Sequence, residues 1–155
     1  MMRRSLLRRR GARSCWYATC FVDPMVPVLG TKKRPLDVLV VEDDVPTLEI
    51  LATFLQRWGA TPHAAANAQE ALHWARSGCR FDVLVSDYDM PGHDGLWLLR
   101  ELTQLAPPGH RPRAVLLTGC AQPELARSAA QVGYDECLVK PIEAKVLLRA
   151  ISGGE

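Results

Sequence analysis

The feature that most constrains this chain is a series of short apolar runs that alternate with segments of helical periodicity. The runs occupy residues 36–41, 60–65, 81–86, 114–118 and 137–139. They have the length of strands that are buried on both faces, and several are rich in β-branched residues. The segments between them carry apolar residues three or four positions apart, as Leu48, Leu51 and Leu55 do. Five strands alternating with five helices predict an α/β, doubly wound fold, with a five-stranded parallel sheet and helices on both faces.

Charge divides the chain into two parts. Residues 1–34 hold nine Lys or Arg and one acid, a net charge of +8, whereas residues 35–155 hold ten Lys or Arg and sixteen acids, a net charge of −6. We expect 1–34 to be a basic, disordered leader or an addition from an upstream start codon, 35–152 to be the folded domain, and 153–155 to be a tail. The arginines of the leader leave open a contact with a membrane surface or nucleic acid.

Composition restricts the class of protein further. Hydrophobic residues make up 48% of the 155 residues, which is enough for one buried core. The five cysteines form no CxxC pair, and this favours reduced thiols in a cytoplasmic protein over a disulfide scaffold. No apolar run approaches the roughly 20 residues of a membrane span.

Polar residues stand at the ends of four of the apolar runs. Glu42 and Asp43 follow the first run, Asp87 follows the third, Thr118 ends the fourth, and Lys140 follows the fifth. The carboxyl ends of parallel strands share one edge of a sheet, so these side chains are expected to converge there. Clustered carboxylates favour a hard cation such as Mg²⁺. Asp87 would then attack phosphorus as a nucleophile, while Lys140 and Thr118 hold the phosphoryl oxygens.

Four motifs carry a resemblance to a known family. The segments VLVVEDD, DVLVSDYDMPGHDG, AVLLTG and CLVKPI resemble those of the response-regulator (CheY-like) receiver domains of two-component signalling, in the family's order. The resemblance implies a (βα)5 flavodoxin-like fold and phosphorylation of Asp87. It also implies Mg²⁺ or Mn²⁺ bound by Glu42, Asp43, Asp87 and the backbone carbonyl of Asp89.

The same resemblance gives roles to residues later in the chain. Thr118 resembles the switch hydroxyl, Lys140 the lysine that pairs with the phosphoryl group, and Pro141 a proline preceded by a cis peptide. Cys137 departs from the family, which usually has an aromatic residue at this position whose reorientation accompanies activation. We therefore expect a switch carried mainly by Thr118 and the loop after it.

The resemblance implies a single-domain response regulator, not a turnover enzyme. Its partners would be a histidine kinase or phosphotransfer protein and an unknown downstream protein, with no nucleic acid bound by the domain itself. A receiver excised from a larger kinase remains an alternative, as does a receiver-like interaction module that is never phosphorylated. The pair Asp87 and Asp89 also resembles the DxD motif of haloacid-dehalogenase-like phosphatases, but in that family the second acidic pair follows the lysine.

Overall fold

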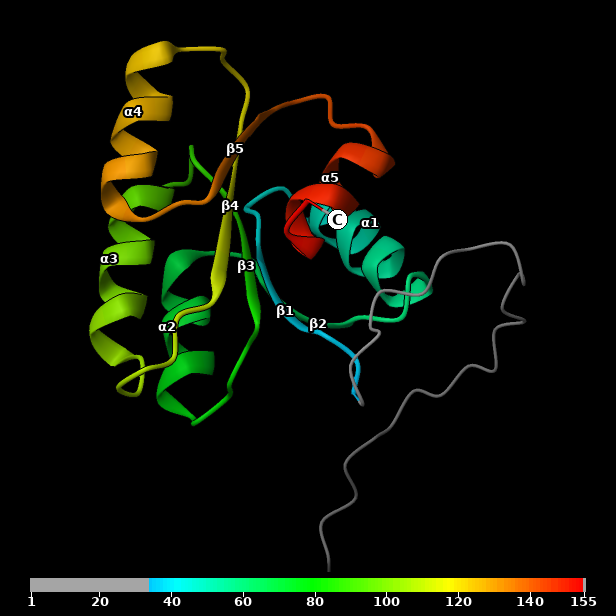
Figure 1. The fold of residues 1–155 in the computed structure, drawn as a ribbon, viewed down its shortest axis with the longest axis vertical. Helices are drawn as coiled ribbons and strands as arrows, with labels where there is room; N and C mark the ends of the chain where they lie inside the picture. Colours follow the sequence, from blue (N-terminus) through cyan, green and yellow to red (C-terminus); the bar gives the residue numbers. More distant parts are fainter. Residues whose placement is uncertain (1–33, 155) are drawn as a thin grey trace, which may run out of the picture.

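The structure is a computed structural model that describes residues 34–154, so the predicted disorder of residues 1–33 falls outside the described part. Strands and helices alternate along the chain (Figure 1). The strands are β1 (Asp37–Val41), β2 (Thr61–Ala65), β3 (Val83–Asp87), β4 (Arg113–Thr118) and β5 (Glu136–Val139). The helices are α1 (Val45–Arg57), α2 (Ala68–Arg76), α3 (Gly95–Leu105), α4 (Pro123–Val132) and α5 (Ala144–Ser152).

The strands form one parallel sheet in the order β2-β1-β3-β4-β5. This is the flavodoxin-like order, and it confirms the predicted fold class. Pro62 lies in β2 at the edge of the sheet, where a residue without an N–H removes no bond from a central ladder. Strand β3, which ends at Asp87, lies at the centre of the sheet.

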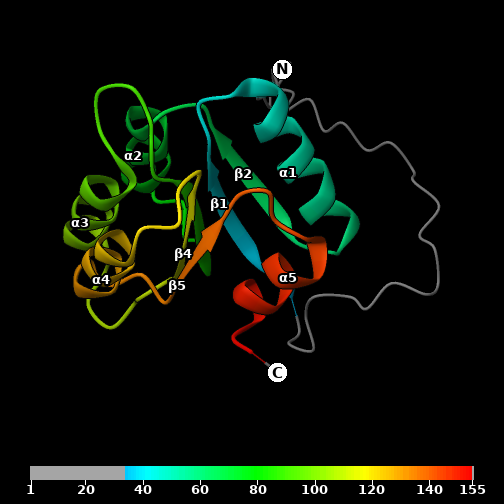
Figure 2. The same cartoon turned by 90° about the horizontal axis from the view of Figure 1, so that it is seen from above.

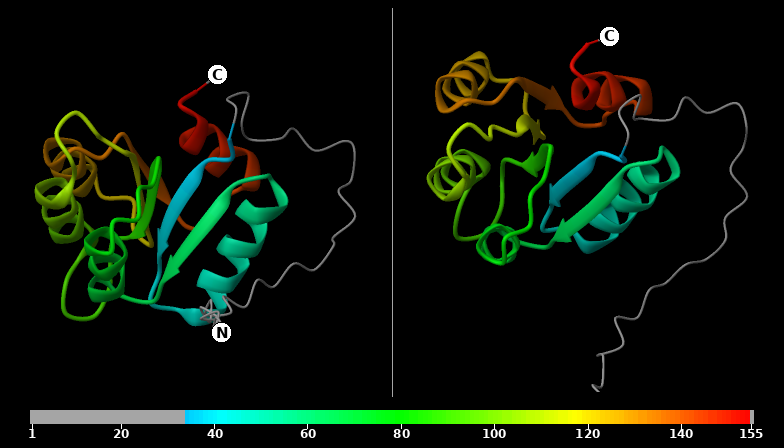
Figure 3. Two further views of the ribbon diagram at one scale, coloured as in Figure 1. Left: turned by 90° about the horizontal axis from the view of Figure 1, so that it is seen from below. Right: turned by 60° about the horizontal axis from the view of Figure 1, so that its bottom comes forward.

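Two hydrophobic cores cover the two faces of the sheet. Alternate residues of β1 and β3 point to opposite sides: Leu39 and Leu84 join the core under α2, α3 and α4, and Val40 and Val85 join the core under α1 and α5. Figure 2 shows this division of the helices from above, and Figure 3 shows it from two further sides. With both faces covered by helices, polar side chains can gather at the carboxyl ends of the strands.

Local signals in the sequence fix where the helices begin. The carboxylate of Asp44 accepts a hydrogen bond from the Thr47 amide at 3.0 Å at the start of α1. The Asn67 side chain accepts from the Glu70 amide at 2.9 Å in the first turn of α2, and the Glu70 carboxylate accepts from the Ala66 amide before the helix at 2.8 Å. Among the described residues, no helix is long and apolar enough to cross a bilayer.

Candidate functional site

Two buried acids stand at the ends of neighbouring central strands. Glu42 directly follows β1 and Asp87 ends β3, and these strands pair in parallel with Val41 opposite Ser86. Glu42 and Asp87 are almost fully buried residues, with 2% and 5% exposure. Asp43, which is exposed, adds a third carboxylate, and ligand oxygens of the three acids lie within 4.8 Å of one another. Three of the predicted cation-binding residues therefore meet at one point.

Lys140, directly after β5, joins this acidic cluster. Its Nζ lies 2.7 Å from Glu42 Oε2 and 2.8 Å from Asp87 Oδ1. The backbone holds it there, since the Lys140 amide donates to the Thr118 carbonyl at 2.7 Å. The Lys140–Pro141 peptide bond is cis. Burial disfavours the charged form, but the hydrogen bonds to Asp87 and Glu42 outweigh it and raise the pKa of Lys140. The ammonium group is therefore a permanent positive charge at neutral pH.

The loop after β3 wraps closely around the Asp87 backbone and side chain. The Asp89 amide donates to Asp87 Oδ2 at 3.1 Å, while the Asp89 residue itself is exposed. Gly95, at the start of α3, packs against the Asp87 carbonyl oxygen, and a Cβ at this position would lie only 2.6 Å from it. Asp94 caps α3 by accepting from the Trp97 amide at 2.7 Å. The loop thus holds Asp87 in two ways, by the Asp89 amide that bonds to its carboxylate and by the close packing of Gly95 against its backbone carbonyl.

Thr118 ends β4 beside Asp87 but its hydroxyl makes its hydrogen bonds elsewhere. The Oγ1 atom accepts from the Cys120 amide at 3.2 Å and donates to the Cys120 carbonyl at 3.4 Å. Thr118 is a buried residue, with 3% exposure. The structure therefore brings Thr118 to the edge of the site, with its hydroxyl bound to the loop that leads into α4.

Sequence reasoning missed Tyr134, a buried residue between α4 and β5. Its hydroxyl donates to the Gly95 carbonyl at 2.7 Å, and burial raises the pKa of the phenol. The phenol therefore connects the segment before β5 to the first residue of α3, directly behind Asp87. The one sequence signal at this residue is its position directly after Gly133, which ends α4. A single aromatic residue forms no periodic pattern, so the sequence does not predict which residue it contacts.

Cys137 lies half-buried in β5, and burial raises the pKa of its thiol. It lines a hollow of about 250 Å³ between α4 and β5. The other lining residues are Ala126, Ala129, Ala130, Tyr134, Asp135 and Glu136. The small residues on α4 and the cysteine on β5 leave this part of the surface concave.

The donor set fits a hard divalent cation. Glu42, Asp43 and Asp87 supply three carboxylates, and Lys140 neutralises only one of these charges. Oxygen ligands with an excess of negative charge are those that Mg²⁺ binds while it keeps part of its hydration shell. The exposed side chain of Asp43 leaves the cluster open to solvent, from which a hydrated ion would enter.

The fold and the cluster define a doubly wound α/β protein with an acid-and-lysine site at the carboxyl edge of its sheet. A family model described as the response regulator receiver domain matches residues 38–152. The chain therefore belongs to the response-regulator receiver family, as its motifs predicted. Receiver domains of this family are phosphoacceptors of two-component signalling and not classical turnover enzymes. Membership excludes the dehalogenase-like alternative.

Similar sequences occur alone and within much longer proteins. The chain is 35% identical over 116 residues to an uncharacterised 14.6 kDa protein of Leptolyngbya boryana, covering 75% of this chain and 87% of that protein. It is 34% identical over 136 residues to the virulence sensor protein BvgS of Bordetella pertussis, covering 83% of this chain but 11% of BvgS. The likeness to BvgS thus concerns one small part of that protein.

Solved structures share the fold. The chemotaxis protein CheY4 of Vibrio cholerae is 28% identical, with a TM-score of 0.70 and coverage of 78% of this chain and 99% of that one. A response regulator of Burkholderia pseudomallei, described with a phosphorylated aspartic acid, a calcium ion and citrate, is 31% identical with a TM-score of 0.67. That alignment covers 75% of this chain and 66% of the Burkholderia chain.

Proposed function

We propose that this chain accepts a phosphoryl group on Asp87 from a histidine kinase or phosphotransfer protein and passes the signal on by protein contacts or phosphorelay. The observation that carries the proposal is the setting of Asp87 at the end of the central strand. Its two oxygens are held by Lys140 and the Asp89 amide, and two further acids lie within reach of a shared cation. The description of the Burkholderia structure supports the same chemistry for a relative.

The transfer follows from the groups present. A carboxylate oxygen of Asp87 attacks the phosphorus of a phosphohistidine, the P–N bond breaks, and an acyl phosphate forms. Lys140 is placed to neutralise a phosphoryl oxygen, because its Nζ already lies 2.8 Å from Asp87 Oδ1. Mg²⁺ or Mn²⁺, held by Glu42, Asp43, Asp87 and the Asp89 carbonyl, would supply further positive charge to the phosphoryl oxygens.

The switch would start at Thr118. A phosphoryl group on Asp87 offers acceptor oxygens that compete for the Thr118 hydroxyl, and turning toward them costs that hydroxyl both hydrogen bonds to Cys120. The loop before α4 is thereby released. The resulting shift would be read on the surface formed by α4, β5 and α5, with the small Cys137 contributing no ring to a partner.

We further propose that residues 35–152 form the receiver, with 1–34 a basic leader and 153–155 a tail. Arg34, the last residue of the leader, pairs with Asp37 and Asp82, and we propose that residues 1–30 are dispensable. The alternative of a receiver-like module that is never phosphorylated makes the opposite prediction about Asp87 chemistry. Incubation with acetyl phosphate and Mg²⁺, read by phosphate-affinity electrophoresis, separates the two. We expect a shifted band that Asp87→Asn abolishes and excess chelator suppresses, whereas Asp89→Asn retains it. An unmodified wild-type chain under these conditions would favour the interaction module.

A further inference from the structure

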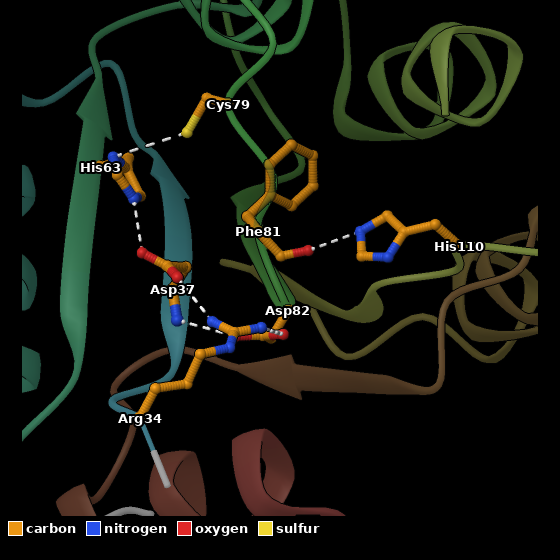
Figure 4. Close-up of polar contacts among 7 residues, drawn as sticks. All are labelled: Arg34, Asp37, His63, Cys79, Phe81, Asp82 and His110. Carbon is orange, nitrogen blue, oxygen red and sulfur yellow. Dashed lines mark hydrogen bonds and ion pairs between the residues drawn. The ribbon is translucent and has the colours of Figure 1, made fainter. Parts of the chain in front are cut away.

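A second cluster of reactive side chains lies away from Asp87, toward the starts of β1 and β3. Figure 4 shows its side chains. Asp37 begins β1, His63 lies within β2, and Cys79 occupies the turn between α2 and β3. All three are half-buried, and none belongs to the acidic site, which stands at the ends of the strands. The neighbouring strands and the turn between α2 and β3 therefore assemble a thiol, an imidazole and a carboxylate from distant parts of the chain.

The three groups are connected in the order carboxylate, imidazole, thiol. His63 Nε2 lies 3.1 Å from Asp37 Oδ1, and Cys79 Sγ lies 3.8 Å from His63 Nδ1. A carboxylate only accepts hydrogen bonds, so Nε2 carries the proton and Nδ1 presents its lone pair to the thiol. This is the arrangement in which a base, oriented by a third group, activates a nucleophile.

Neighbouring residues hold the carboxylate and the ring in place. Arg34 Nη1 lies 2.7 Å from Asp37 Oδ2, so one oxygen of Asp37 faces the guanidinium while the other faces His63. The indole of Trp74 packs edge-on against the His63 ring, with 5.3 Å between the ring centroids. Trp74 is itself fixed by its Nε1 donating to the Ala64 carbonyl at 3.1 Å.

We propose that Cys79 is a site of thiol modification, with His63 as the base and Asp37 as the positioning residue, and that its co-reactant is a low-molecular-weight disulfide. His63 Nδ1 takes the thiol proton as Cys79 Sγ attacks one sulfur of the disulfide. The Cys79–sulfur bond forms, the S–S bond of the co-reactant breaks, and the departing thiolate takes the proton from the imidazolium. The products are a mixed disulfide on Cys79 and one free thiol.

Removal of the proton during the attack is needed here because the resting sulfur is a thiol. Burial, and then the charge of Asp37, raise the pKa of Cys79, so few molecules carry a preformed thiolate at neutral pH. Cys120 is exposed and Cys137 half-buried, and neither has a hydrogen bond to a histidine within the described part of the chain. The base therefore distinguishes Cys79 from the other described cysteines.

A cavity beside Cys79 has room for the organic part of the disulfide. Its volume is about 260 Å³, and Cys79 is one of its lining residues. Most of the lining is apolar, including Phe81 and Leu105, while Arg80 and His110 add basic groups. This lining favours an aromatic disulfide that carries carboxylates.

A metal ion is a weaker interpretation of the same cluster. Over residues 34–154, the one group of three or more potential ligands that lie close enough to share an ion is Glu42, Asp43 and Asp87. At Cys79 only the sulfur and His63 Nδ1 face each other, because the remaining nitrogen of His63 is turned to Asp37. Two donors do not make a closed site.

The test uses the full chain with Cys15, Cys20, Cys120 and Cys137 changed to Ser, and the probe is dithiobis(nitrobenzoate), an anionic aromatic disulfide. Release of the coloured thiol gives the rate of reaction at Cys79. His63→Gln is expected to slow the reaction at Cys79 by at least about tenfold. The loss should stay below that of a full general-base effect, because the small fraction of free thiolate still reacts without a base. Asp37→Asn is expected to slow the reaction less. A matched chain that keeps only Cys120 should react at the same rate with and without His63→Gln.

An unchanged rate at Cys79 in a folded His63→Gln chain, checked by circular dichroism, would overturn the proposal. Should that variant not fold, the pH dependence of the parent Cys79-only chain decides. Three groups face His63: Asp37 from β1, the indole of Trp74 from α2, and Cys79 from the turn after α2. Arg34 lies on the far side of Asp37. Without a base, the rate follows the thiolate fraction and falls tenfold for each pH unit below pH 8. We expect the rate of the Cys79-only chain to fall less steeply than that, and a full tenfold fall per pH unit would refute base assistance. Neither result depends on Asp87, because the reaction takes place away from it, toward the starts of β1 and β3.

Discussion

Lys140 Nζ lies 2.8 Å from Asp87 Oδ1, and this contact joins the end of β5 to the end of β3. The same ammonium reaches the buried Glu42, so one cation serves two carboxylates that have little access to water. The cluster therefore holds three carboxylates and one ammonium, an excess of negative charge that a divalent cation would neutralise.

Lys140→Gln should lower the stability of the chain in the absence of divalent cations. Glu42 and Asp87 would lose their shared counter-charge, at a cost of about 1–3 kcal/mol in the free energy of unfolding. Urea denaturation measures the loss, and added Mg²⁺ should recover part of it by binding the three acids. Lys145→Gln, at an exposed position of α5, is the matched control and should change stability by less than about 0.5 kcal/mol. Equal stability of the two variants would argue against the role of Lys140.

Gly95→Ala should destabilise the loop that holds Asp87. The added methyl group would meet the Asp87 carbonyl oxygen at 2.6 Å and Leu116 Cδ1 at 2.8 Å, so either the backbone or the core must shift. Overpacking of this kind costs about 1–3 kcal/mol, and we expect slower phosphorylation as well. Gly119→Ala provides the control, because nothing lies within 4 Å of a Cβ there. Thermal melting of both variants tests the difference.

The contact of Tyr134 predicts a loss of stability at alkaline pH. Burial raises the pKa of the phenol in the folded chain above its ordinary value of 10.0, so the folded chain binds this proton more tightly than the unfolded chain does. The contribution of the protonated phenol to the free energy of unfolding is complete below pH 10 and is lost as the pH rises above that value. Tyr134→Phe also loses the hydrogen bond to the Gly95 carbonyl, at about 1 kcal/mol. Unfolding curves from pH 8 to 11 should therefore be less pH-dependent in the variant than in wild type.

The sequence predicted the sheet and the strand-end residues because both depend on local patterns. Apolar runs mark buried strands, and the residue after each run must lie at the edge, which is how Glu42 and Asp87 were found. Side-chain direction is set by tertiary contacts instead. Nothing in the run before Thr118 reveals that its hydroxyl bonds to Cys120, and no spacing rule connects Tyr134 to Gly95. One strand boundary also differs from the prediction. The apolar run predicts that the third strand begins at Phe81, but β3 begins at Val83, and Phe81 packs into the core before the strand.

A chain that begins at Thr31 should fold and accept phosphate like the full chain. Both cores and the acidic cluster are built from residues beyond that point, and Arg34, which pairs with Asp37 and Asp82, is retained. Melting temperature and labelling by acetyl phosphate should agree between the two chains. A large fall in melting temperature on truncation would mean that residues 1–30 pack on the domain.

The central claim is that Asp87 is the phosphoacceptor, and transfer from a phosphorylated histidine kinase tests it most directly. Wild type, Asp87→Asn and Asp89→Asn should be incubated with a panel of kinases carrying radioactive phosphate, with Mg²⁺ and with excess chelator. We predict that label moves to wild type and to Asp89→Asn in Mg²⁺, that chelator suppresses the transfer, and that Asp87→Asn takes up none. Equally fast labelling of Asp87→Asn would contradict the assignment.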